Sequence, residues 1–144
     1  MAITRIQLGT LAPNATAATL DELFRLNADK HPVIDRILAE AGISSPESLA
    51  HFLTIALLAS GGLTNFNSDV YGIGASDWLA ARARDWHDAR LGEEAERWDM
   101  NLIVAALTPK LSIAADWPTI WAKLDEVCGL MGIENRMEEF AFEG

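Results

Sequence analysis

Apolar residues recur every three or four positions along most of this chain, and glycine or proline interrupts the pattern at intervals. This spacing places apolar side chains on one face of a helix, and glycine and proline are typical of helix ends. The pattern predicts about six helices, over residues 19–29, 32–41, 45–60, 77–91, 93–107 and 116–131. The predicted fold is therefore all-α, a compact bundle of these helices.

The segment 45–60 is predicted to be the central helix of the bundle. It is apolar on nearly all of its faces, which is typical of a helix that other helices surround. Two helix starts are indicated by the spacing of a capping box, in Thr19 with Glu22 and in Ser44 with Glu47. These signals favour helices that begin close to Thr19 and Ser44.

Two further helices are predicted between residues 77 and 107. Ser76 is expected to cap the first of them, and Gly92 is expected to end it. The second runs from Glu93, where acidic residues suit the positive end of a helix. The stripe of this second helix that we expect to face the core consists of Trp98, Leu102, Ala105 and Ala106.

The length of 144 residues fits one acidic helical domain over 1–144, whose two ends differ from its helical middle. Residues 1–18 are predicted to be an N-terminal arm and loop, with a short strand at 3–8, where the pattern partly alternates. Residues 134–144 are predicted to be a short acidic C-terminal tail. The longest predicted loop is 63–75, and loops of that length in compact domains are often functional.

The charge balance narrows the range of partners. The chain has 21 Asp and Glu against 11 Lys and Arg, a net charge of −10. We predict no nucleic acid and no membrane as partners, because affinity for phosphate backbones and for anionic lipid surfaces comes from Lys and Arg. The acidic surface either serves solubility or attracts a protein partner with a basic surface.

The cysteine and the hydropathy pattern predict a cytoplasmic protein. Cys128 is the only cysteine, so no intramolecular disulfide forms, which suits a reducing compartment. The first residues do not have the charged and apolar regions of a signal peptide. The most apolar stretch, 49–59, is shorter than the roughly 20 residues that span a bilayer.

Candidate catalytic and ligand-binding motifs are weak in this sequence. The histidines His31, His51 and His87 are too far apart for a zinc motif, and Cys128 lies among apolar residues as a core thiol does. The glycines in 72–74 precede a predicted helix, where free N–H groups hold anions, but the rest of a phosphate-binding motif is absent. We therefore predict no catalytic residues, no metal and no cofactor, and a role other than catalysis is favoured.

Residues 37–50 resemble a helix-hairpin-helix unit, in which a glycine-containing hairpin offers backbone amides to DNA phosphates. Gly42 takes the place of the first hairpin glycine. Ser44 and Ser45 stand near the place of the second, and no Lys or Arg flanks the turn. The resemblance thus implies a corner between two helices and does not extend to DNA binding.

Aromatic residues are the strongest indication of a binding surface. The chain has five tryptophans, and Trp with Arg often anchors protein interfaces. Trp78, Arg82 and Trp86 are spaced four residues apart on one predicted helix, so that Arg82 can stack on either indole. The alternative is that these rings fill the core. The predicted partner-binding residues are Phe66, Tyr71, Trp78, Arg82, Trp86, Phe140 and Phe142.

Three functions are compatible with this sequence. The leading hypothesis is a non-catalytic, acidic protein-binding module, such as an inhibitor, an immunity-type or anti-defence protein, or an adaptor. A second is a homo-oligomeric structural or assembly protein of a phage particle. A third is a small-ligand-binding protein or enzyme with a pocket near residues 63–75, formed by Tyr71, Trp86 and His87.

Overall fold

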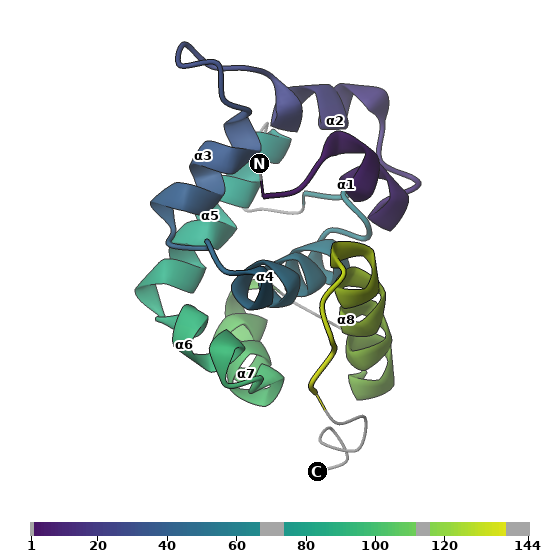
Figure 1. Cartoon of the computed structure of the whole chain (residues 1–144), viewed down its shortest axis with the longest axis vertical. Coiled ribbons are helices and arrows are strands. Elements are labelled where there is room, and N and C mark those ends of the chain that lie inside the picture. The colour runs from purple at the N-terminus through teal and green to yellow at the C-terminus, as the bar shows by residue number, and fades with distance from the viewer. Residues whose placement is uncertain (1, 67–73, 112–115, 138–144) are drawn as a thin grey trace.

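The computed structural model describes residues 2–66, 74–111 and 116–137, and the side chains of 108–111 lie outside this description. The fold is all-α, as predicted, with eight helices in these ranges where the sequence predicted about six (Figure 1). The helices are α1 Arg5–Leu11, α2 Ala17–Phe24, α3 Val33–Glu40, α4 Pro46–Ala59, α5 Ala75–Asp88, α6 Leu91–Glu96, α7 Met100–Leu111 and α8 Trp117–Met131.

Helix α4 is the centre of the bundle, as its apolar sequence predicted. Every residue from 48 to 57 is buried. The helix packs against α8 on one side and against α5, α6 and α7 on the other, while α1 and α2 close one end of the molecule (Figure 1). Because α4 touches so many neighbours, its residues contribute most directly to the stability of the fold.

The predicted strand at 3–8 is wrong, because this segment enters helix α1. Thr4 is the N-cap, and a capping box with Gln7 closes the helix start: Gln7 N donates to Thr4 Oγ1 at 3.1 Å, and Thr4 N donates to Gln7 Oε1 at 2.9 Å. These two bonds satisfy free amides that a lone strand would leave unpaired. Ile3 and Leu8 are buried, so the predicted N-terminal arm is in part a component of the core.

Two other helix starts differ from their predicted positions. Helix α2 begins at the N-cap Thr16, which accepts from Thr19 N, and α4 begins at Ser45, which accepts from Ser48 N, each at 3.1 Å. Several neighbouring Ser and Thr residues were suitable caps, and spacing alone chose the wrong ones. Glu22, predicted to close its own helix, is thereby available for a contact elsewhere.

That contact is a cap on helix α5. Its N-cap is Gly74, two residues before the predicted Ser76, and no side chain of its own caps it. Glu22 on α2 supplies the missing acceptor, since its Oε2 lies 2.6 Å from Ser76 N. A carboxylate at this end of a helix also interacts favourably with the helix dipole. One residue therefore joins α2 to the start of α5.

Replacing Glu22 by alanine is expected to lower the free energy of unfolding by about 0.5–2 kcal/mol, the range measured for lost helix caps. Urea unfolding followed by circular dichroism measures the change. Glu40→Ala is the matched control, because Glu40 is exposed and only pairs with Arg36 along α3; its loss should stay within about 0.5 kcal/mol. Equal losses in the two variants would contradict a capping role for Glu22.

The predicted helix 93–107 is divided in two. Helix α6 ends at Glu96 and α7 begins at Met100, and between them Trp98 adopts a positive φ of 58°. The face of α7 that meets the core consists of Met100, Ile103, Val104 and Leu107. Of the predicted stripe only Trp98 is buried, whereas Leu102, Ala105 and Ala106 are exposed. Because α7 is apolar on both sides, the periodicity did not identify which side faces inward.

The last helix agrees with its prediction. Asp116 is the N-cap of α8, and Gly132 ends it with a φ of 73°. The following residues run back along α8 (Figure 1), where Trp121 Nε1 donates to the carbonyl oxygen of Met137 at 3.0 Å. No helix in the described ranges is both long enough and apolar enough to cross a membrane.

Candidate functional site

Two of the aromatic residues predicted to bind a partner are buried in the core, and a third is half-buried. Trp78 is 2% and Trp86 is 1% exposed. Phe66 is half-buried and packs against Trp78, with ring centroids 5.5 Å apart. This burial agrees with the alternative interpretation, in which the rings fill the core. Tyr71, Phe140 and Phe142 lie outside the described residues, and their binding role stays a prediction.

The expected stacking of Arg82 on an indole is present. The Arg82 guanidinium carbon lies 5.8 Å from the centroid of the Trp78 ring. Arg82 Nε also lies 3.2 Å from an oxygen of Asp85, one turn further along α5. Both contacts hold Arg82 on its own helix, so they stabilise α5 within the bundle.

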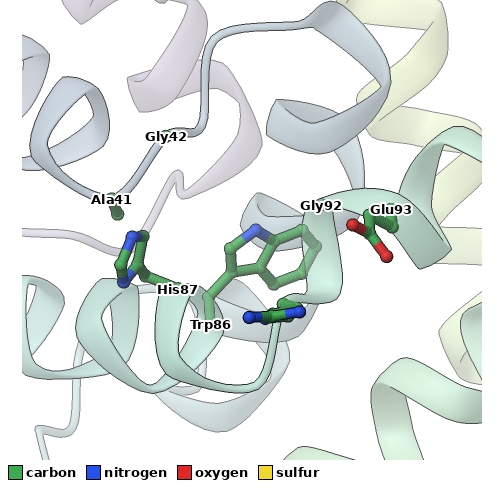
Figure 2. A pocket seen from close by; sticks show the side chains of 7 residues that line it. Ala41, Gly42, Trp86, His87, Gly92 and Glu93 are labelled. Carbon is green, nitrogen blue, oxygen red and sulfur yellow. The ribbon is translucent and has the colours of Figure 1, made fainter.

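A pocket of about 270 Å³ lies where the turn between α3 and α4 meets the junction of α5 and α6. Figure 2 shows the Trp86 indole between His87 on one side and Gly92 on the other. The pocket thus brings together two of the three residues predicted for a ligand site, and Tyr71 lies outside the description. Its lining consists of Ala41, Gly42, Trp86, His87, Arg90, Gly92 and Glu93.

Several residues of this pocket were not found from the sequence. Gly92 was predicted to end a helix, but it lies inside α6, and Arg90 is the residue with the left-handed backbone, at φ 56°. The sharp turn at Arg90 brings the first turn of α6 next to Trp86. Gly42 and Ala41 come from a distant corner and reach the pocket only through packing.

The outer side of α7 is an apolar face exposed to solvent. Leu102 is 50% exposed, and Ala105 and Ala106 are exposed beside it. Among the described elements, helix α7 has its main contacts with α6 and α4, and these three residues remain exposed. We call Leu102, Ala105 and Ala106 the α7 face. Leu102 with two neighbouring alanines forms a small exposed apolar surface, and such surfaces mark contact sites where they extend.

The remaining candidate chemical groups are enclosed in the core. His51 is fully buried, and burial lowers its pKa below the usual 6.5. Cys128 is also buried, and burial raises the pKa of its thiol to about 11, so it stays protonated and unreactive at neutral pH. Within the described residues, no group of three or more His, Cys, Asp or Glu side chains is arranged to hold a metal ion.

Two segments whose backbone amides were considered as anion sites form hydrogen bonds within the protein. The amide of Ser76, at the start of α5, donates to the Glu22 carboxylate, so the protein's own side chain occupies this place. Gly42, with φ 70°, closes α3 in the ordinary way, because Ile43 N donates back to the Leu38 carbonyl at 2.9 Å. Gly42 and Gly74 are therefore accounted for as helix ends, and residues 72 and 73 lie outside the described residues.

Comparison with protein-family models, with curated proteins and with solved structures gives no match to this chain.

Proposed function

We propose that this protein is a non-catalytic protein-binding module, such as an inhibitor or adaptor, whose docking surface is the α7 face. The observation that carries the proposal is the contrast between two helices that are mostly apolar in sequence. Helix α4 is buried on every side, whereas α7 leaves Leu102, Ala105 and Ala106 in solvent. An exposed apolar helix face is suited to a partner.

The charges beside this face support a basic partner. The segment that leads into α7 carries four acidic residues and one arginine, namely Glu93, Glu94, Glu96, Asp99 and Arg97. Arg97 lies 3.7 Å from Glu94, which leaves the other three carboxylates as a local negative surplus. A partner with an apolar ridge edged by Lys or Arg complements this surface, and the overall charge of −10 accelerates the encounter.

The test is the loss of a partner when the α7 face is charged. Proteins captured from the native host by the wild type are compared with those captured by Leu102→Glu, at low and at raised salt. The matched control is Leu26→Glu, which makes the same change on a leucine that is 61% exposed elsewhere. We expect Leu102→Glu to weaken capture at least about tenfold and Leu26→Glu to leave it intact. Raised salt should reduce capture by the wild type and by Leu26→Glu.

Two results would overturn the proposal. A partner retained by Leu102→Glu as well as by Leu26→Glu would place the contact elsewhere. A wild-type dimer or ring that becomes monomeric in Leu102→Glu would mean that the α7 face binds a second copy of the chain, as in an assembly protein. Analytical ultracentrifugation of the purified wild type and of both variants distinguishes the second result.

A further inference from the structure

The pocket beside α5 is lined by Trp86, and the Ser48 hydroxyl lies next to Gly92, another lining residue, without lining the pocket itself. Trp86 is packed edge-on against Phe52, with ring centroids 5.6 Å apart. Ser48, on α4, is 3% exposed. Within the described residues, neither Trp86 Nε1 nor the Ser48 hydroxyl takes part in a hydrogen bond of the protein. Neither atom is among the fully buried unpaired atoms of the described residues, so both are within reach of solvent and can donate to a ligand.

Gly92 keeps both groups uncovered. A Cβ at this position would lie 3.4 Å from Ser48 Oγ and 3.9 Å from Trp86 Nε1. The backbone of Gly92 lies in helix α6 and does not have a positive φ, so its conformation does not require glycine. Since alanine favours helices over glycine, the glycine costs stability here. What it provides is access from the pocket to the indole N–H and the hydroxyl.

The rim of the pocket carries charges of both signs. Arg90 and Glu93 are three residues apart, both exposed, and neither forms an ion pair with any residue in the described ranges. His87 stands on the other side of the Trp86 ring (Figure 2). A ligand above Trp86 therefore meets a cation, an anion and the indole N–H in one small cavity, with the Ser48 hydroxyl beside Gly92.

We propose that this pocket binds a small zwitterion, a free α-amino acid. The carboxylate accepts hydrogen bonds from the Trp86 indole N–H and the Ser48 hydroxyl and pairs with the Arg90 guanidinium, which suits carboxylates in shape and charge. The ammonium group pairs with Glu93. The volume of about 270 Å³ lies just below the range of pockets for drug-sized ligands, which matches a metabolite of this size. This site is separate from the α7 face.

The NMR signal of the Trp86 indole N–H reports binding directly. In the ¹⁵N-labelled protein, the twenty L-amino acids are added one at a time at millimolar concentration, and the indole N–H signals are followed by NMR. Trp86→Phe identifies the Trp86 signal among those of the five tryptophans. We expect a subset of amino acids to shift that signal in a saturable way, and their N-acetylated or amidated forms to bind at least about tenfold more weakly.

A pair of glycine substitutions separates binding from folding. Gly92→Ala places a methyl group over the two donors and is expected to weaken binding at least about tenfold. Gly129→Ala is the control, because Gly129 also lies in a helix, α8, and a Cβ there would meet nothing within 4 Å. Both variants should be at least as stable as the wild type, and Gly129→Ala should bind like it.

Three results would overturn the zwitterion site. The first is that no amino acid shifts the Trp86 signal of the wild type. The second is that Gly92→Ala binds as tightly as Gly129→Ala. The third is that the N-acetylated or amidated forms bind as well as the free amino acids. None of these measurements depends on the α7 face, so the site and the proposed protein-binding function succeed or fail separately.

Discussion

Replacing Phe52 by alanine is expected to lower the free energy of unfolding by about 3–5 kcal/mol, the range for large aromatic side chains removed from a core. Phe52 is buried at the centre of α4 and meets the edge of the Trp86 ring at 85°. Its loss removes that contact and leaves a cavity that helices on several sides of α4 cannot all move to fill. Because small domains are stable by about 5–15 kcal/mol, the variant should lose a large part of its stability. Urea unfolding followed by tryptophan fluorescence measures the change.

The control for this prediction is Leu102→Ala. It also shortens a large apolar side chain in a helix, but Leu102 is half exposed on α7. We expect its effect on the free energy of unfolding to stay within about 0.5 kcal/mol. If both variants lost the same stability, α4 would not have the central place that its burial indicates.

Helices α4 and α8 were predictable because their local and global signals agree. Helix α4 has a serine cap, a proline in its first turn and apolar residues on every side, and a helix of that composition is stable only when others surround it. Helix α8 begins at Asp116 and ends at Gly132, which are strong local signals at both ends. For α8 no distant contact was needed to choose the boundaries, and for α4 the local signals left only the choice between Ser44 and Ser45 as the cap.

The predicted helix ends and caps were wrong where contacts with residues distant in the sequence determine them. Trp98 was expected to continue a helix, but it turns out of it with a positive φ and packs its ring edge-on against His51, at a centroid distance of 4.7 Å. Glu22 was expected to cap its own helix, but it caps α5 across the fold. Burying a large ring and satisfying a free amide outweigh the small preferences of local sequence.

Only those residues of the pocket that are neighbours in the sequence could be predicted. Trp86 and His87 are neighbours on one helix, so the sequence indicated that they would share a surface. Arg90 and Glu93 enter the pocket because of an unusual backbone turn, and Gly42 enters it because α3 packs against α5. The α7 face was missed for a related reason, since the sequence offered two apolar sides and the fold buried the other one.

Acidification is expected to destabilise this protein through His51, in the range just below pH 6.5. His51 Nδ1 lies 2.8 Å from the Glu47 carbonyl oxygen, which accepts the proton on that nitrogen, and no partner for the buried Nε2 lies within the described residues. Burial lowers the pKa of His51 below 6.5, although the hydrogen bond to Glu47 and the charge of Glu47 raise it in part. A second proton on the ring would thus place a charge among apolar groups.

The sign of the effect follows from proton uptake by the two states. Above pH 6.5 the ring is neutral whether the chain is folded or unfolded, and His51 adds no pH dependence. Below pH 6.5 the unfolded chain takes up a proton that the folded chain refuses, so stability falls as the pH falls, until the pH reaches the lowered pKa of the folded state. The slope cannot exceed about 1.4 kcal/mol per pH unit for one proton.

Urea unfolding at several pH values between 5 and 7.5 checks this expectation. His51→Leu, which has no titratable ring, should flatten the decline between pH 6.5 and 5, whereas His31→Gln, a change at an exposed histidine, should keep it. The N-cap Asp116, whose pKa is lowered by hydrogen bonds from Thr119, loses its contribution at more acidic pH, because its unfolded pKa is near 3.8. If His51→Leu declined as steeply as the wild type, the acid sensitivity would come from other groups, and the unpaired nitrogen at the centre of α4 would have no thermodynamic consequence.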